Sequence, residues 1–505
     1  MRRWIVFGLV ISLGVALLSG VALARVKNFV VIGTTDKIVS LDPAKAYDYL
    51  SCNILQNVMS GLVDYKPGTA DIVPALAERW EISKDGKVYT FYLRKGLKFS
   101  DGTPFNAQAV KFSIDRVFKL KGDPAFLLTE VIKKVEVVDD YTVRITLKYP
   151  YAPFLSVMAF TVAFPVSPKA YNDKEFSDVA VGIGPYKIKK WTRDVELVLE
   201  ANPNWYGTPP KAKLVVIRFY QSAQSLRMAI EKGEIDVAYR TLNPEDIMAI
   251  KKEGKLKVYD GESPVIRYIV FNVKKKPFDD VLVRKAIAYA INRYMITKRV
   301  FRDTAVPLYS MIPMGMWGHI DALPKHDMKK AVELLKKAGY DKDHPLEVNL
   351  WYTPTHYGST EADVAQILKL MLEATGVIRV NIKYAEWATY VDYFEKGNIG
   401  FFLLGWYPDY LDPDDYMWPF LHSSGSPSLG SFYSSPKMDE LLLKARQLPD
   451  QGERAKVYEE AQKLLAEDVP YIPLWQAKQY CVAKPEVKGI LLEPTQVFRY
   501  YLIHK

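Results

Sequence analysis

Residues 401–413 read Phe-Phe-Leu-Leu-Gly-Trp-Tyr-Pro-Asp-Tyr-Leu-Asp-Pro and join an apolar run to a loop of aromatic, proline and aspartate residues. The apolar run at 401–404 is short and uncharged, which is typical of a buried strand. A strand that delivers rings and a carboxylate into a loop favours a ligand cleft, and a packed Pro/Asp turn is the alternative. Within this loop, the indole of Trp406 offers flat contact area, and the carboxylate of Asp409 can pair with a cation such as an α-amino group.

The segments before this stretch alternate between strand and helix patterns. Residues 346–352 and 377–384 read as strands, and residues 360–375 between them read as a helix that Gly376 ends. This order implies an α/β lobe with a largely parallel sheet, which the strand at 401–404 joins. At 505 residues the chain is too long for one core, so we expect two or three lobes.

Composition and charge exclude several classes of partner. The chain has 68 Lys and Arg against 58 Asp and Glu, a formal net charge of +10, and 49% hydrophobic residues, as in ordinary globular proteins. The basic residues are scattered, so we expect no nucleic-acid partner. Gly182 and Gly184 lack the third glycine of a nucleotide loop, and Pro185 removes a donor there, so we expect no nucleotide cofactor.

The N-terminus has the pattern of an export signal. Arg2 and Arg3 precede a largely apolar run at 4–18, and residues 22–24 read Ala-Leu-Ala, a cleavage site. We predict a signal peptide at residues 1–24 and an exported chain in the periplasm or at the outer face of the cytoplasmic membrane. A retained anchor is the alternative, since residues 4–23 are barely long enough to span a bilayer.

The chain has two cysteines, Cys52 and Cys481. We expect two separate buried thiols, and a disulfide between them, which export would permit, is the alternative. Two cysteines are too few to hold a metal cluster.

The motifs of secreted hydrolases and metalloproteases are missing. Residues 425–430 read Gly-Ser-Pro-Ser-Leu-Gly, which is not G-x-S-x-G, and the six His residues include no H-E-x-x-H. The acids at 409, 412, 414 and 415 could supply a glycosidase pair or a calcium site, although their spacing matches no EF-hand loop. We therefore expect no enzyme, no catalytic residue and no metal site.

Eight motifs in order resemble the solute-binding proteins of bacterial and archaeal ABC importers, in the dipeptide/oligopeptide-binding group. They span nearly all of the mature chain, and their shared order is more specific than any one of them. The motifs are Leu-Asp-Pro at 41–43, the block 76–104 that begins Leu-Ala-Glu-Arg-Trp, Gly-Ile-Gly-Pro-Tyr at 182–186, Gly-Glu-Ile-Asp at 233–236, the block 277–287 that begins Pro-Phe-Asp-Asp, Ala-Glu-Trp at 385–387, the loop at 406–413, and Asp-Val-Pro-Tyr-Ile-Pro at 468–473.

The resemblance implies an α/β fold of the periplasmic-binding-protein kind, with two lobes, three domains and a hinge between the lobes. The ligand would lie between the lobes, which would close on it by hinge motion. The chain would cross between lobes near residues 266–271 and 478–481. The implied domains are a lobe I main domain at 25–61, 166–268 and 480–505, an extra domain at 62–165 packed on lobe I, and lobe II at 269–479.

The resemblance also implies ligand contacts. Asp409 occupies the place of the aspartate that pairs with the α-amino group of a peptide. Trp406 and Trp387 match two aromatic positions of the cleft. Gly405 and Tyr407 would contact the ligand main chain through their own backbone groups, which allows broad specificity.

Two further positions follow from the same resemblance. Dipeptide binders place an arginine for the ligand carboxylate near the position of His356, and this chain has none there. A neutral histidine holds a carboxylate less firmly than a guanidinium, so His356 is either a ligand contact or an ordinary loop residue. Tyr47 and Asp48 lie where relatives touch the ligand, and a surface loop is the alternative.

The function that the resemblance implies is capture of short peptides outside the cytoplasm. The protein, a monomer without a cofactor, would deliver them to the permease subunits of an ABC importer. Capture of oligosaccharides by the same fold is the alternative, because Trp and Tyr suit sugar stacking as well as peptide binding.

Overall fold

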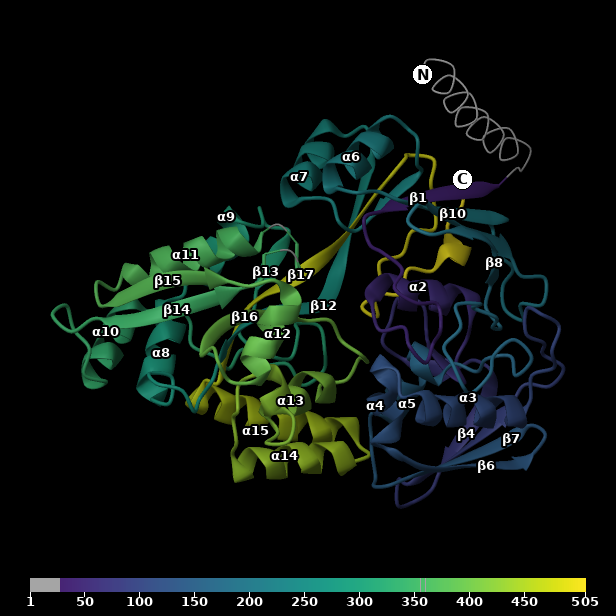
Figure 1. Ribbon diagram of the computed structural model, residues 1–505, viewed down its shortest axis with the longest axis horizontal. Helices are drawn as coiled ribbons and strands as arrows, with labels where there is room; N and C mark the ends of the chain where they lie inside the picture. The colour runs from purple at the N-terminus through teal and green to yellow at the C-terminus, as the bar shows by residue number, and fades with distance from the viewer. Residues whose placement is uncertain (1–27, 355, 359) are drawn as a thin grey trace, which may run out of the picture.

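The computed structural model describes residues 28–354, 356–358 and 360–505, so the predicted signal peptide at 1–24 lies outside the described residues. Two lobes are joined by two long strands, β12 (Lys257–Phe271) and β17 (Tyr471–Ala483), which run from one lobe into the other (Figure 1). Within the described residues we find no helix that combines the length and the apolar character needed to cross a membrane.

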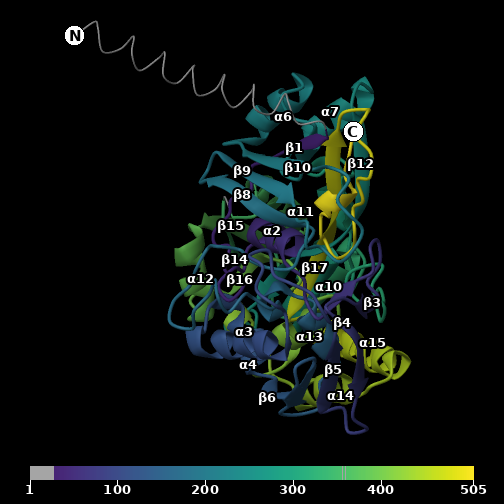
Figure 2. The same ribbon diagram turned by 90° about the vertical axis from the view of Figure 1, so that its right-hand side faces the viewer.

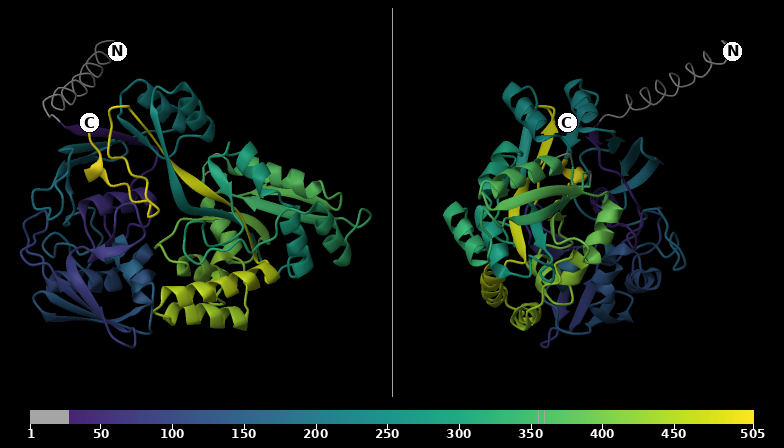
Figure 3. Two further views of the ribbon diagram at one scale, coloured as in Figure 1. Left: turned by 180° about the vertical axis from the view of Figure 1, so that it is seen from behind. Right: turned by 60° about the vertical axis from the view of Figure 1, so that its left-hand side comes forward.

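One eleven-stranded sheet passes through both lobes, in the order β15-β14-β16-β12-β17-β11-β1-β10-β9-β8, with β13 paired to β17. Strands β12 and β17 are antiparallel partners, and their register shifts between Glu262 and Ile266. Before this shift Tyr259 packs on the core of the first lobe, and after it Ile266 belongs to the core of the second. The irregular pairing therefore lies within the crossing. The view from behind shows the two strands passing between the lobes (Figure 3).

The first lobe is built on parallel strands β1, β10 and β11, which the antiparallel strands β9 and β8 extend. Alternate residues of β1 face opposite sides: Val30 and Ile32 pack toward α2, while Val31 packs against α6 and α7. Figure 2 shows α2 beside β8 of this sheet. The elements are β1 (Phe29–Thr34), α2 (Tyr49–Val58), β8 (Tyr186–Thr192), β9 (Glu196–Ala201), β10 (Leu214–Phe219), α6 (Ala223–Glu231), β11 (Val237–Tyr239), α7 (Pro244–Glu253) and η4 (Tyr500–Leu502).

A smaller unit packs below the first lobe and has its own antiparallel sheet, in the order β4-β5-β7-β6. A turn at residues 83–87 joins β4 to β5, and residues 140–141 join β6 to β7 in a tight hairpin. The elements are β2 (Val63–Tyr65), β3 (Ile72–Pro74), β4 (Ala77–Ile82), β5 (Val88–Leu93), α3 (Ala107–Leu120), η1 (Asp123–Ala125), α4 (Phe126–Thr129), β6 (Ile132–Asp139), β7 (Thr142–Leu147), α5 (Phe154–Met158) and η2 (Thr161–Ala163).

The second lobe contains the predicted strand–helix–strand unit, and β16 joins its sheet as expected. The prediction of a largely parallel sheet is wrong, because the crossing strands β12 and β17 and the short β13 are antiparallel to their neighbours. The elements are α8 (Val281–Ala290), α9 (Arg293–Arg299), β13 (Ala305–Pro307), α10 (Met328–Lys337), β14 (Leu346–Tyr352), α11 (Glu361–Glu373), β15 (Ile378–Tyr384), α12 (Trp387–Glu395), β16 (Phe401–Trp406), α13 (Asp414–Leu421), η3 (Ser426–Leu429), α14 (Pro436–Gln447) and α15 (Gln451–Asp468).

The two cysteines are separate buried thiols, which confirms the expectation and excludes the alternative of a disulfide between them. Cys52 lies on α2, where the hydroxyl of Thr161 donates a hydrogen bond to its sulfur at 3.5 Å. Cys481 lies on β17 within the apolar core of the first lobe. Both residues therefore fill core positions.

The domain boundaries expected from the sequence stay a prediction. The apolar residues of the described chain form one large cluster in the second lobe, one in the small unit, and two on the faces of the first lobe's sheet. Tyr410 is an exception to the division by sequence, because it follows β16 and yet is buried in the cluster of the small unit. The loop after β16 therefore reaches across from the second lobe.

Candidate functional site

Buried ion pairs hold the loop that follows β16. The carboxylate of Asp412 accepts two hydrogen bonds from Arg454, at 2.8 and 2.6 Å, and that of Asp414 accepts two from Arg446, at 2.8 and 2.9 Å. Asp414 also accepts the hydroxyl of Tyr410 at 2.8 Å. Buried ion pairs of this kind hold the loop in one conformation, since removing one member leaves the other as an uncompensated buried charge. Two of the four acids in this stretch therefore position the loop.

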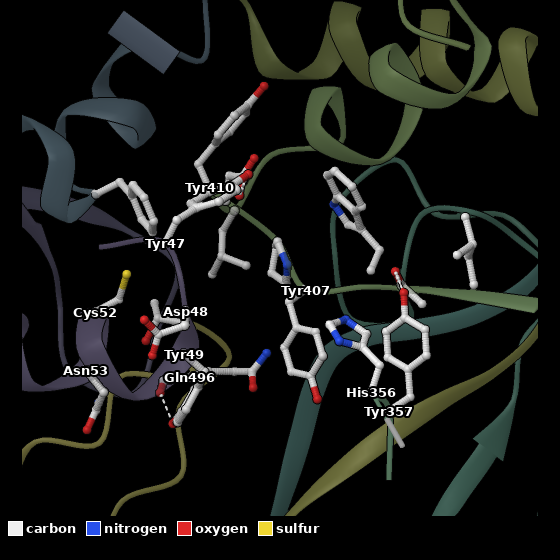
Figure 4. A pocket seen from close by; sticks show the side chains of 18 of the residues that line it. Tyr47, Asp48, Tyr49, Cys52, Asn53, His356, Tyr357, Tyr407, Tyr410 and Gln496 are labelled. Carbon is white, nitrogen blue, oxygen red and sulfur yellow. Dashed lines mark hydrogen bonds between the residues drawn. The ribbon is translucent and has the colours of Figure 1, made fainter. Parts of the chain in front are cut away.

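A cavity of about 610 Å³ lies between this loop and α2 (Figure 4). The structure brings all seven predicted ligand contacts to its wall, from both lobes, and their roles in binding stay a prediction. They are Tyr47, His356, Trp387, Gly405, Trp406, Tyr407 and Asp409. Asp48 lines it too, and its side chain also caps α2 by accepting the backbone N–H of Ser51.

Asp409 connects the two lobes within this cavity. The hydroxyl of Tyr47 donates to its Oδ1 at 2.7 Å. Asp415 lies beside it and accepts the indole N–H of Trp406 at 2.9 Å and the backbone N–H of Asp409 at 3.1 Å. Burial raises the pKa of Asp409 to about 7, and the bond from Tyr47 offsets part of the increase. Burial, followed by the charge of Asp409, also raises the pKa of Asp415.

Two neighbouring carboxylates, one buried at Asp415 and one half-buried at Asp409, are costly to ionise together without a cation. The pair at Asp409 and Asp415 therefore favours a ligand group that carries positive charge. The ring of Trp406 is held beside this pair by its own hydrogen bond and packs edge-on against Phe420, with ring centroids 5.1 Å apart.

His356 stacks on Trp387, with ring centroids 3.6 Å apart and planes 2° from parallel. Partial burial, followed by the charge of Arg267, lowers the pKa of His356 to about 4. The imidazole is therefore neutral at pH 7 and adds no positive charge to the cavity. The carbonyl of Gly405 accepts the hydroxyl of Tyr357 at 3.3 Å, so this oxygen already has a protein partner.

Sequence reasoning missed two arginines next to the cavity. Arg240 follows β11 and lines the cavity; its guanidinium lies 3.7 Å from the ring centroid of Tyr49 and 5.6 Å from that of Tyr407. Arg267 is buried on β12, 3.9 Å from the ring centroid of Tyr357. A single arginine after a strand gives no composition signal, and only its place at the carboxyl end of an α/β strand could have indicated a ligand role.

The comparisons with known proteins agree with this geometry. The family model for bacterial extracellular solute-binding proteins, family 5 (middle), matches residues 71–428. The probable D,D-dipeptide-binding periplasmic protein DdpA of Escherichia coli K12 is 31% identical over 490 residues, which cover 94% of this chain and 93% of the relative. Heme-binding protein A of Haemophilus influenzae is 31% identical over 499 residues, which cover 92% of this chain and 90% of that protein.

A solved structure of the periplasmic binding protein DppA from Helicobacter pylori, in complex with the peptide STSA, superposes with a TM-score of 0.80 at 30% identity. The match covers 94% of this chain and 98% of that one. The predicted resemblance and the predicted two-lobe α/β fold are confirmed. The chain belongs to family 5 of the bacterial extracellular solute-binding proteins.

Proposed function

We propose that the protein captures short peptides outside the cytoplasm, as a monomer, and delivers them to the permease of an ABC importer. Relatives named for dipeptide binding and a neighbour solved with a bound peptide support the ligand class. The observation that carries the proposal is the position of Asp409. It lines a cavity between the lobes, and within the described residues no Lys or Arg forms an ion pair with it.

The α-ammonium of a peptide supplies the cation that Asp409 and Asp415 lack. An ammonium–carboxylate hydrogen bond is charge-assisted, and it relieves the repulsion between the two acids. The rest of the ligand can pack on the aromatic rings of Trp387, Trp406 and Tyr407. Such ring contacts do not require a charged group on the ligand. The site therefore recognises the end of a peptide more strictly than its side chains.

We further propose that the protein binds its ligand without transforming it. A glycosidase needs two free carboxylates across a cleft. Asp412 and Asp414 are each held by an arginine, and Asp415 accepts the Trp406 indole and the Asp409 backbone N–H. These partners leave Asp409 as the acid of this stretch that faces a ligand.

Oligosaccharide capture is less well supported by this site. Sugars stack on indole and phenol rings, which the cavity provides, but a neutral sugar brings no cation to Asp409. The sugar hydroxyls would contact the carboxylate of Asp409, whose ionised form is disfavoured by burial. The charge at this end of the cavity therefore favours the peptide.

Titration calorimetry tests this assignment on protein stripped of ligand by unfolding and refolding. Trialanine and tetra-alanine with a free amine should bind at pH 8, and their N-acetylated forms should bind at least about tenfold more weakly, which is about 1.4 kcal/mol. Cellotriose should give no binding heat. Equal affinity for the acetylated peptides removes Asp409 from the amine role, and binding of cellotriose alone overturns peptide capture.

A further inference from the structure

A second cavity, of about 720 Å³, continues the first one past Tyr407. Five residues line both cavities: Arg240, His356, Tyr357, Tyr407 and Gln496. Figure 4 shows the ring of Tyr407 between Gln496 on one side and His356 on the other. The two cavities are therefore parts of one elongated cleft that Tyr407 narrows.

The sheet topology places Arg240 at the centre of this cleft. β1 and β11 are parallel neighbours, with Gly33 opposite Ala238, so the residues after both strands lie at one edge of the sheet. Asp36 follows β1, Arg240 follows β11, and both line the second cavity. In open α/β sheets, ligands bind at the carboxyl ends of the strands.

The guanidinium of Arg240 has donors to spare. Its Nε donates to Asp36 at 3.1 Å, and one terminal nitrogen donates to Gln496 at 3.5 Å. The hydroxyl of Tyr407 is a third partner, and a guanidinium has five N–H donors in a fork, so two of them remain for another acceptor. Arg240 and Thr241 both have positive φ values, of 61° and 58°. This backbone is costly for residues other than glycine and is typical of ligand sites.

Charge changes sign along the cleft. The first cavity is lined by three carboxylates, of Asp48, Glu395 and Asp409, and by the single guanidinium of Arg240. The second is lined by Arg240 and Lys478 and by one carboxylate, that of Asp36. A ligand with a positive and a negative end would therefore lie in one direction along the cleft.

We propose that Arg240 binds the carboxylate of the peptide. The α-amino group of the same peptide lies at Asp409, on the other side of Tyr407. This inference rests on the proposed function and assigns the second cavity to the carboxyl end of the ligand. The guanidinium comes from the first lobe, whereas the resemblance placed such a group near His356. Because the imidazole there is neutral, Arg240 is the cation that lines both cavities within the described residues.

A comparison of peptide acids with peptide amides tests the proposal. Trialanine and tetra-alanine, each with a free carboxylate or a C-terminal amide, are titrated into wild type, Arg240→Gln and Arg240→Lys at pH 8. Wild type should prefer the acid over the amide by at least about tenfold. Arg240→Gln should bind both forms equally, and Arg240→Lys should show an intermediate preference, since lysine keeps the charge and loses the fork.

Arg218→Gln is the matched control, because it removes the same charge from β10, outside both cavities, and should keep the wild-type preference. Binding of the amide forms by the Arg240 variants shows that they are folded and competent. An undiminished acid preference in either Arg240 variant overturns the inference, as does equal binding of acid and amide by wild type. Loss of the preference in Lys478→Gln alone assigns the carboxylate to Lys478. A wild type that binds no peptide in either form contradicts the proposed function itself.

Discussion

Replacing Asp409 by Asn is the change that most sharply separates ligand binding from stability. The amide oxygen can still accept the hydroxyl of Tyr47, now at 2.7 Å, so the cavity should keep its shape. What disappears is the negative charge. Hydrogen bonds to charged groups contribute about 1.5–3 kcal/mol, which corresponds to about 10- to 150-fold in affinity for a peptide amine.

The pKa of Asp409 adds a pH dependence to this loss. Burial raises that pKa to about 7, and an ammonium ligand needs the ionised carboxylate. Wild-type affinity should therefore be full at pH 8 and should fall as the pH drops through 7. Below pH 7 each pH unit costs up to about tenfold, so the fall at pH 5 reaches about 100-fold. Asp409→Asn should weaken this dependence, because Asp415 is then the only acid of the pair that titrates.

Stability should move in the opposite direction. The folded protein raises the pKa of Asp409 from its ordinary value of 3.8, so the folded state binds this proton more tightly than the unfolded state. The cost of the charge is absent below pH 4, grows between pH 4 and 7, and is complete above 7. Asp409→Asn should therefore raise the Tm of ligand-free protein at pH 8 and leave it nearly unchanged at pH 4.

Calorimetric titration of trialanine at pH 5, 6, 7 and 8 measures the affinities, and thermal unfolding at pH 4 and pH 8 measures the stabilities. Asp392→Asn, an exposed acid on α12 that pairs with Lys396, is the matched control and should behave as wild type in both. A wild-type affinity that is the same at pH 5 and pH 8 would refute the reasoning. So would an Asp409→Asn variant that keeps the wild-type affinity at pH 8.

Two further predictions concern the core. Alkylation in denaturant without reductant should add two labels, at Cys52 and Cys481. The native protein should react slowly, because burial raises the pKa of Cys52 to about 12. A denatured chain that takes up no label would show a disulfide. Arg454→Met should lower the free energy of unfolding at pH 7 by about 3–5 kcal/mol, because it leaves the buried carboxylate of Asp412 without its partner. Urea denaturation measures this loss. A loss below about 1 kcal/mol would show that the pair does not hold the loop.

Segments with strong periodicity could be predicted from the sequence. β14 has the predicted bounds, and α11 lies within the predicted residues 360–375, since their apolar spacing matches one pattern only. A crossing between the lobes was expected near residues 266–271, and β12, the strand that makes it, in fact begins at Lys257. Its first half contains Asp260 and Glu262 and shows no apolar alternation, so pairing with β17 defines it instead.

The site was predictable where composition marked it. The loop at 406–413 is dense in aromatic and acidic residues, and its predicted contacts do line one cavity. Arg240 was missed because one arginine after a three-residue strand is indistinguishable from the scattered basic residues of the surface. Its place beside Asp36 depends on the parallel pairing of β1 with β11, whose residues are about 200 positions apart.

The sequence left a disulfide between Cys52 and Cys481 open as an alternative for a related reason. Export makes a disulfide chemically possible, but a bridge also requires two suitably close and oriented residues. The fold places Cys52 on α2 and Cys481 on β17, each with its own neighbours, and leaves both thiols free.

A crystal structure of the protein with bound tetra-alanine tests the central claim most directly. The account predicts an extended peptide between the lobes, with its amine nitrogen within about 3.2 Å of a carboxylate oxygen of Asp409. A peptide bound outside this cleft, or one whose amine faces away from Asp409, would contradict it.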